Sequence, residues 1–196
     1  MNKDRFRIIL NIGIILTVFL SWGNLTFFSS GFMSSRNFSS LKYFTILSNV
    51  FEAIVSIIWL WKKDEQLKYI AAVSLSVTFF TVLFFLGPTM GYAAMFGGTC
   101  FWLHGAVPIA SIAEFIYFDE EPVSKKDQVL ACMPLLIYGT VYLGNNLING
   151  IGEWPNTNDW YGFLRWGYRT GLAIFTVMII LAYNVAGILK KLQIHQ

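Results

Sequence analysis

The sequence has few charged residues. Only 13% of its 196 residues are Asp, Glu, Lys or Arg, whereas a soluble domain carries roughly 25%. Hydrophobic residues make up 56% of the chain and aromatic residues 17%. So few polar side chains cannot cover the apolar surface of the chain against water. The composition therefore excludes an ordinary soluble domain and indicates lipid as the solvent.

Cysteine is also scarce, with only Cys100 and Cys132 present. The topology predicted below puts them near opposite membrane faces, which argues against a disulfide bridge. Neither has a second cysteine at metal-ligand spacing, so we expect no metal and no cofactor. No dense block of Lys and Arg occurs, and we therefore expect no nucleic-acid partner.

Six segments are long and apolar enough to cross a bilayer as helices, which takes ~20 mostly apolar residues. They are residues 8–28, 43–61, 69–88, 101–118, 129–148 and 166–189. Gly87 and Pro88 are expected to end the third, and residues 89–100 would form a short loop or an interfacial segment. The predicted fold class is all-α: a polytopic membrane protein with six transmembrane helices in one bundle, forming a single domain over residues 1–196.

Lys and Arg residues are unevenly divided between the two sides of these spans. One side holds ten of them: Lys3, Arg5, Arg7, Lys62, Lys63, Lys68, Lys125, Lys126, Lys190 and Lys191. The other side holds four: Arg36, Lys42, Arg165 and Arg169. Because positively charged loops stay in the cytoplasm, this bias predicts that both chain ends are cytoplasmic.

Polar residues of the spans gather near the outer ends in this topology. They are Asn24, Thr45, Ser48, Asn49, His104, Asn145, Asn146 and Asn149, against Asn184 alone near the inner ends. Polar groups in lipid usually face a bundle interior or a cavity. The pattern therefore predicts a polar outer half of the bundle and a site near the outer face.

Thr45 and His104 are matched in depth. Thr45 lies two residues into the second span and His104 three residues into the fourth, and both spans start at the outer face. On the second span, Thr45, Ser48, Asn49 and Glu52 share one helical face. On the fourth, Pro108 cannot donate to the carbonyl of residue 104 and predicts a kink. Whether the two helices are neighbours is left open.

A hydroxyl beside an imidazole is the minimal equipment for nucleophilic acyl chemistry, since the base takes the proton of a weak nucleophile. A third group normally orients the imidazole, and the alternatives here are Asn49, Asn145, Asn146 and Asp159. Both residues also have a purely structural alternative. A Thr at a helix start is often a cap or a back-bonded hydroxyl, and a single membrane His often bonds a neighbouring helix.

Four charged residues are further candidates. Glu52 would orient a polar network or serve a structural role. Glu114, near the inner end of its span, is expected to reach the cytoplasmic interface. Arg165 and Arg169, at the outer start of the last span, would bind a lipid carboxylate or phosphate, or extend to the interface.

Two motifs carry a family resemblance. The stretch Lys42-Tyr43-Phe44-Thr45-Ile46-Leu47-Ser48-Asn49 and the stretch Leu103-His104-Gly105-Ala106-Val107-Pro108, with Glu114 after it, resemble motifs of the androgen-induced-gene family of membrane hydrolases. They are most similar to its bacterial branch. The resemblance implies six helices and a threonine hydrolase that cleaves fatty acid esters of hydroxy fatty acids. Thr45 would be the nucleophile and His104 the base.

The function predicted from the sequence is therefore an intramembrane hydrolase of lipid esters in a bacterial plasma membrane, with membrane lipids as partners. One alternative is a small transporter or lipid-binding carrier, because three spans before and three after an outer loop allow an inverted repeat. The other alternative is a structural or assembly partner with no catalytic activity.

Overall fold

The computed structural model describes residues 3–28, 38–119, 121–153 and 157–193, which form helices and no strand. Arg36, counted above, lies outside these residues. The elements in order are α1 (Lys3–Phe27), η1 (Ser39–Lys42), α2 (Phe44–Lys62), α3 (Glu65–Thr81), η2 (Val82–Leu86), α4 (Gly87–Met90), α5 (Tyr92–Phe96), α6 (Thr99–Phe101), η3 (Trp102–Ala106), α7 (Val107–Phe118), α8 (Lys125–Leu130), α9 (Met133–Asn149) and α10 (Tyr168–Leu192).

Six helical stretches in the described chain are long and apolar enough to cross a membrane. They are Lys3–Phe27, Phe44–Lys62, Glu65–Met90, Thr99–Phe118, Lys125–Asn149 and Tyr168–Leu192. The six predicted helices are thus confirmed, each within a few residues. Gly87 and Pro88 do not end the third, which continues to Met90 because the helix changes register ahead of the proline.

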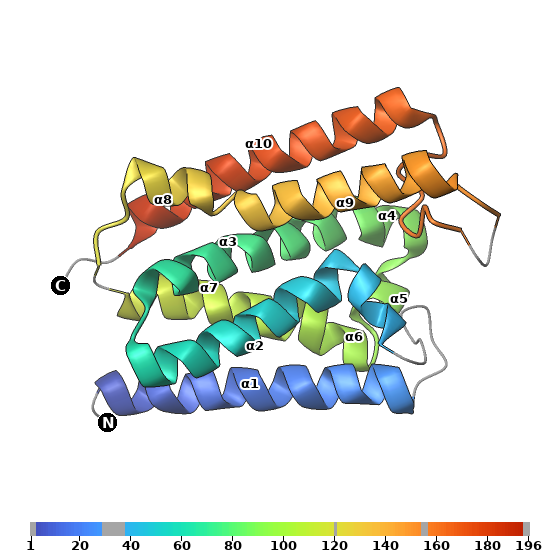
Figure 1. Ribbon diagram of the computed structural model, residues 1–196. Helices are drawn as coiled ribbons and strands as arrows, with labels where there is room; N and C mark the ends of the chain where they lie inside the picture. Colours follow the sequence, from blue (N-terminus) through green and yellow to red (C-terminus); the bar gives the residue numbers. More distant parts are fainter. Residues whose placement is uncertain (1–2, 29–37, 120, 154–156, 194–196) are drawn as a thin grey trace.

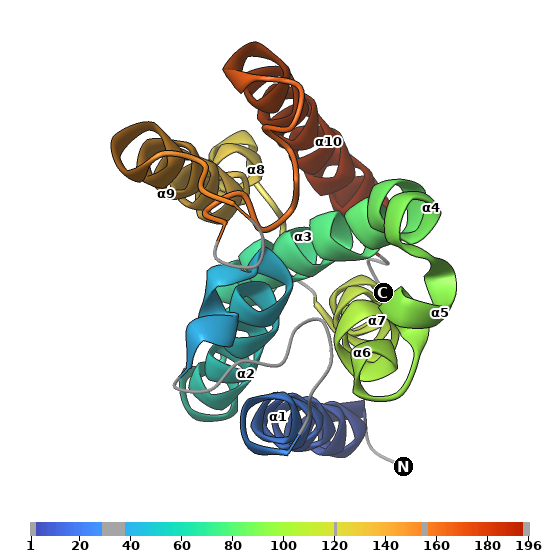
Figure 2. The same cartoon turned by 90° about the vertical axis from the view of Figure 1, so that its right-hand side faces the viewer.

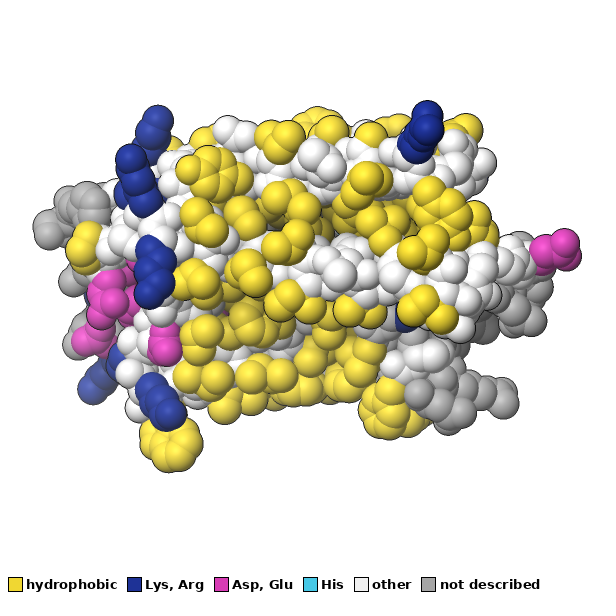
Figure 3. Space-filling view, turned by 45° about the horizontal axis from the view of Figure 1, so that its top comes forward, with side chains coloured by type: hydrophobic (Ala, Val, Ile, Leu, Met, Phe, Trp, Pro, Cys, Tyr) yellow, Lys and Arg dark blue, Asp and Glu magenta, His cyan; other side chains and the backbone are white. Residues whose placement is uncertain are grey.

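The helices run roughly along one another, with α3 at the centre (Figures 1 and 2). On one side of α3 lie α1, α2 and α7, and on the other lie α9 and α10. Helix α1 begins and α10 ends at the same end of the bundle, here called the terminal end. The opposite end, which holds η1 and residues 157–167, is called the loop end. Hydrophobic side chains cover the middle of the face in Figure 3.

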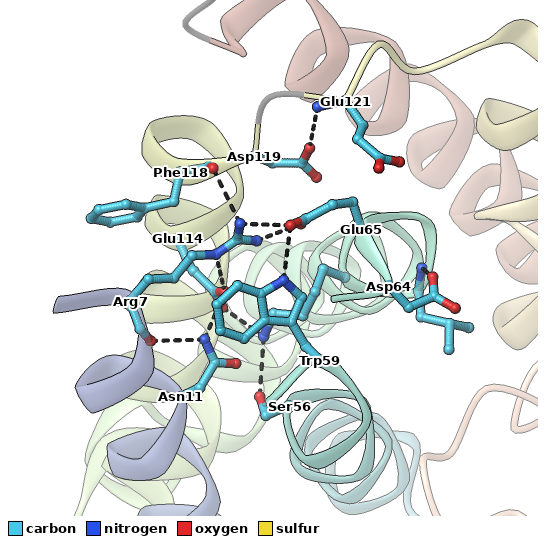
Figure 4. Close-up of polar contacts among 12 residues, drawn as sticks. Arg7, Asn11, Ser56, Trp59, Asp64, Glu65, Glu114, Phe118, Asp119 and Glu121 are labelled. Atoms are coloured by element: carbon cyan, nitrogen blue, oxygen red, sulfur yellow. Dashed lines mark hydrogen bonds and ion pairs between the residues drawn. The ribbon is translucent and has the colours of Figure 1, made fainter. Parts of the chain in front are cut away.

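A chain of alternating charges, most of them buried, joins α3 to the three helices on this side of it, α1, α2 and α7. Arg7 of α1 donates from both Nη atoms to Glu65 of α3, at 2.7 and 2.5 Å, and from Nε to Glu114 of α7 at 3.0 Å (Figure 4). Glu114 also accepts from Asn11 at 2.8 Å. Glu114 and Asn11 are fully buried, and Arg7 is 5% exposed. The expectation that Glu114 reaches the cytoplasmic interface is therefore wrong.

The chain of charges continues through Lys68 of α3 to Glu52 of α2. The Lys68 ammonium lies 2.6 Å from Glu52 Oε1 and 2.6 Å from Glu114 Oε2, and it also donates to Ser56. The expectation that the outer half is the polar half of the bundle is therefore wrong, because the buried ion pairs lie in the terminal half. Asn184, the polar residue expected near the inner ends, is exposed. A charge in lipid is tolerated when an opposite charge meets it inside the bundle.

Removing Lys68 should leave Glu52 and Glu114 buried without their shared cation. We expect Lys68→Met to lower the free energy of unfolding by about 3–5 kcal/mol, as for other buried ion pairs that lose one partner. The measurement is thermal or denaturant unfolding of the purified protein in detergent. Lys126→Met, at an exposed lysine, is the control and should change little. Equal stability of the two variants would contradict a structural role for the charges.

Asp119, just after α7, fastens the chain end to the terminal end of the bundle. Gln193 donates to its Oδ1 at 3.2 Å and to its backbone carbonyl at 3.1 Å. The Asp119 carboxyl is 1% exposed, and burial raises its pKa to about 7, with Glu65 and Glu121 adding to the effect and Arg7 and the Glu121 amide opposing it.

Because the folded pKa of Asp119 lies above its ordinary value, the folded state binds more protons than the unfolded state between about pH 4 and 7. The contribution of Asp119 to stability is therefore complete below pH 4 and is lost as the pH rises to 7. We expect Asp119→Asn to flatten this decline, as measured by melting temperature against pH. An unchanged pH profile would show that Asp119 titrates at its ordinary value.

Candidate functional site

Thr45 lies in the first turn of α2 at the loop end and is 4% exposed. The N-terminus of α2 has no side-chain cap from Tyr43. Instead, the hydroxyl of Tyr161, from the loop before α10, accepts the Phe44 amide at 2.7 Å and also interacts with the amide and hydroxyl of Thr45. Burial raises the pKa of Tyr161 to about 12, so its phenol stays neutral and retains a proton to donate.

Asn49 joins α2 to the segment that carries His104. Its Nδ2 donates to the carbonyl of Thr45 at 2.7 Å and to the carbonyl of Leu103 at 2.9 Å. Asn49 is fully buried. The sequence left the adjacency of these two helices open, and this amide shows that they are neighbours at the depth of Thr45 and His104.

His104 is held by a backbone carbonyl. Its ring is 1% exposed, and Nδ1 forms a hydrogen bond with the carbonyl of Met95 in α5. A carbonyl only accepts, so Nδ1 carries the proton and Nε2 is the nitrogen able to accept one. The ring of Phe96 meets the imidazole edge to face, with centroids 6.3 Å apart. The orienting group is thus a carbonyl, which was not among the sequence candidates.

The backbone at His104 forms one turn of π helix, and Pro108 lies just after it. In η3 the amide of Val107 bonds the carbonyl of Trp102, five residues back. The next amide in this register would bond Leu103, but residue 108 is a proline and has none. Asn49 supplies the missing donor to Leu103. Pro108 therefore acts through a register change, and the carbonyl left without a helical donor is that of Leu103 and not that of residue 104. A side chain of α2 supplies the donor.

The same arrangement occurs at the loop end of the third membrane-length helix. In η2 the amide of Gly87 bonds the carbonyl of Val82, and Pro88 follows. The carbonyl of Leu83, left without its helical donor, accepts the hydroxyl of Tyr92 at 2.9 Å. Segments of π helix are common at functional sites, and here both lie at the loop end beside the short helices α4, α5 and α6.

Thr45 and His104 share no hydrogen bond in the described part of the chain. Thr45 lies beside Tyr161, since the two line the same small cavity, and Nδ1 of His104 faces the Met95 carbonyl. A small cavity of about 20 Å³ adjoins Thr45 and is lined by residues including Thr78, Tyr138 and Tyr161. That volume is enough for about one water molecule.

Ser48 lies between Thr45 and a second, larger cavity. Its Oγ lies 3.1 Å from the Thr45 carbonyl and 2.9 Å from Thr78 Oγ1. Ser48 also lines a groove of about 610 Å³ between α2 and α9. The rings of Phe44 and Tyr138, with centroids 5.1 Å apart, line both cavities and separate them.

Glu52, on the same buried face of α2, belongs to the chain of charges and not to the Thr45 cavity. Asn145 lines the 610 Å³ groove. Asn146 is buried and donates to the carbonyls of Tyr142 and Asn158, at 2.9 and 3.0 Å, so its role is to hold the loop. Asp159 accepts the Tyr142 hydroxyl and the Leu164 amide.

The two arginines of the loop end stand apart from Thr45. Arg165 and Arg169 are both exposed. The guanidinium of Arg165 lies 5.1 Å from the Trp166 ring centroid. The structure places neither beside His104 or in the two cavities.

Sequence reasoning missed Tyr138, Tyr161 and Met95. Tyr161 belongs to the aromatic-rich stretch from Trp160 to Phe163, which lies between the fifth and sixth predicted spans. Met95 lies in residues 89–100, for which the sequence predicts a short loop or an interfacial segment. Nothing in the local pattern of either segment indicates which helix its residues meet, and only the folded chain does.

Within residues 3–28, 38–119, 121–153 and 157–193, no cluster of three His, Cys, Asp or Glu residues could hold a metal ion. Comparison with protein-family models, curated protein sequences and solved structures finds no match. The family resemblance therefore depends on the two motifs alone.

Replacing Asn49 should loosen the joint between α2 and η3. We expect Asn49→Leu to destabilise the protein by about 1–3 kcal/mol, since the Leu103 carbonyl is left buried without a donor. Asn184→Leu is the matched control: Asn184 also bonds a carbonyl four residues back, at 2.7 Å, but on an exposed face. Thermal unfolding of both variants measures the difference. A larger loss at Asn184 would refute the proposed joint.

Proposed function

We propose that this chain is an integral membrane hydrolase of long-chain lipid esters, with Thr45 as nucleophile and His104 as general base. Fatty acid esters of hydroxy fatty acids, or similar acyl lipids, would be its substrates. The protein would lie in a bacterial plasma membrane with both chain ends in the cytoplasm. The terminal end, which holds Lys62, Lys63, Lys190 and Lys191, would then face inward and the loop end outward.

One observation carries the proposal above the others: the side-chain amide of Asn49 binds the carbonyls of Thr45 and Leu103 together. It thereby holds the nucleophile's turn of α2 against the turn that bears the base. The Met95 carbonyl supports the same assignment, because it fixes the tautomer in which Nε2 of His104 can accept a proton.

In the first step, Thr45 Oγ1 attacks the ester carbonyl carbon while its proton passes to Nε2 of His104. The bond from that carbon to the alcohol oxygen then breaks. The alcohol leaves with the proton from His104, and the acyl group stays on Thr45. Water attacks the acyl-threonine with His104 again as base, the fatty acid leaves, and Thr45 Oγ1 regains its proton. Atoms balance with water as the only co-reactant.

Substrate must bring the two side chains together for this chemistry. Thr45 shares a cavity with Tyr161, and we propose that its side chain turns toward His104 when substrate binds. Catalytic hydrogen bonds that are long or misaligned without substrate commonly form only in the complex. The phenol of Tyr161, which accepts the Phe44 amide, would donate its proton to the developing oxyanion.

A fluorophosphonate probe tests the proposal, because it labels activated hydroxyl groups. We expect the wild type to be labelled at Thr45, and Thr45→Ala and His104→Ala to lose about a hundredfold or more in labelling rate, as when a general base is removed. Labelled peptides are identified by mass spectrometry, and hydrolysis of a lipid ester is followed in parallel.

Two control variants make the result specific. Thr176→Ala removes an exposed, back-bonded hydroxyl of α10 and should leave labelling intact. Ser48→Ala tests the neighbouring hydroxyl. Labelling that survives Thr45→Ala would move the nucleophile to another residue. Folded wild-type protein without labelling or hydrolysis would favour the carrier.

A further inference from the structure

The 610 Å³ groove between α2 and α9 has the shape of a site for one acyl chain. Its walls are residues at helical spacing, Phe44, Leu47, Ser48 and Phe51 on α2, and Pro134, Ile137, Tyr138, Val141, Tyr142 and Asn145 on α9. Ser74 of α3 forms part of the lining. From Pro134 to Asn145 the groove spans about 16 Å at 1.5 Å per residue. That is about half of a ~30 Å hydrocarbon core, the depth of one leaflet.

The ends of the groove differ in polarity. Lys42, Asn145 and Trp160 line it near the loop end, whereas Phe51, Pro134 and Ile137 line it deeper along the helices. A lipid of the same leaflet has this polarity too, with a polar head at the surface and an apolar tail toward the midplane. Volumes of about 300–1,000 Å³ with mostly apolar walls and a few polar groups are typical of ligand sites.

Lys42 gives the mouth of the groove a positive charge. Its ammonium lies 5.3 Å from the Tyr43 ring centroid and 5.6 Å from that of Trp160. Among the described residues it forms no ion pair with a carboxylate, and no acidic residue lines the groove. A half-buried cation between rings suits a compact anion more than a bulky headgroup.

The mouth is also rigid. The Tyr138 hydroxyl donates to the Lys42 carbonyl at 2.7 Å, and Trp160 Nε1 donates to the Tyr138 hydroxyl at 3.0 Å. The position of the Lys42 backbone is thereby fixed before any ligand arrives, which reduces the entropy lost on binding.

From these features we propose that the groove binds a single-chain carboxylate lipid, an unesterified long-chain fatty acid, with its carboxylate at Lys42 and its chain between α2 and α9. This binding does not require hydrolysis, since Phe44 and Tyr138 separate the groove from the Thr45 cavity. If the protein is also the proposed hydrolase, which this inference does not require, the groove would hold the fatty acid after its release.

A long-chain fatty acid with a photoreactive diazirine in mid-chain tests the site on the full-length protein in lipid nanodiscs. We expect cross-links on α2 and α9 within the groove, identified by mass spectrometry. The experiment is run on the wild type and on Thr45→Ala, which should be labelled equally. This test therefore does not depend on whether the hydrolase proposal is correct. Failure of the cross-linking test would likewise leave the hydrolase proposal standing.

Two pairs of matched variants locate the chain and the head. Val141→Phe fills the groove, while Val177→Phe changes a valine that is equally exposed, 64%, on α10. We expect labelling of the groove to fall about fivefold in the first and to persist in the second. Lys42→Gln should weaken labelling about fivefold, the effect of losing one partly screened charge pair, and Arg165→Gln should not.

Three outcomes would overturn the proposal. Cross-links spread evenly over the lipid-facing sides of α1 and α10 would mean that the probe reports only bilayer contact. Equal loss in Val141→Phe and Val177→Phe would place the chain elsewhere. Equal labelling by the methyl ester of the same fatty acid would remove the role of Lys42 and leave a site for neutral chains or for phospholipid tails.

Discussion

The alternating charges Glu52, Lys68, Glu114, Arg7 and Glu65 are the constraint on which the rest of the structure depends. They bring one residue or more from each of α1, α2, α3 and α7 to a common point, and each buried charge meets an opposite one. A buried charge cannot be left unpaired without a large penalty. The four helices therefore have one mutual register, and the depth of every other residue on them follows from it.

With that register fixed at the terminal end, the loop end is free to carry irregular backbone. Two prolines interrupt helical hydrogen bonding there, and side chains of Asn49 and Tyr92 restore the donors. The segment before Pro108 is thereby held in π register, and His104 points to the Met95 carbonyl. The proposed chemistry and the proposed lipid groove both lie in this less regular half, where α2, α9 and the 157–167 loop meet.

The six helices could be predicted because apolar runs of membrane length are read directly from sequence. The matched depths of Thr45 and His104 followed from the same spans. That the two helices are neighbours could not be predicted, since it depends on which carbonyl the Asn49 amide reaches. Arg7 and Lys68 were counted as loop cations, and the error has a physical cause. Charge bias is counted by position along the chain, whereas burial depends on partners, such as Glu114, that lie 107 residues from Arg7.

That separation has a consequence for biosynthesis. A ribosome delivers α1, α2 and α3 before α7, so Arg7 and Lys68 are made before Glu114 exists to receive them. A charged residue without a partner is disfavoured in a membrane helix, by about 2.5–3.5 kcal/mol at the helix centre on insertion scales and by less toward the helix ends, where Arg7 and Lys68 lie. If the chain inserts into a bilayer as it is made, Arg7 stays near the water interface or pairs first with Glu65 until α7 is synthesised. Helices α1, α2 and α3 would then leave the translocon as a group whose buried ion pairs are incomplete until α7 arrives.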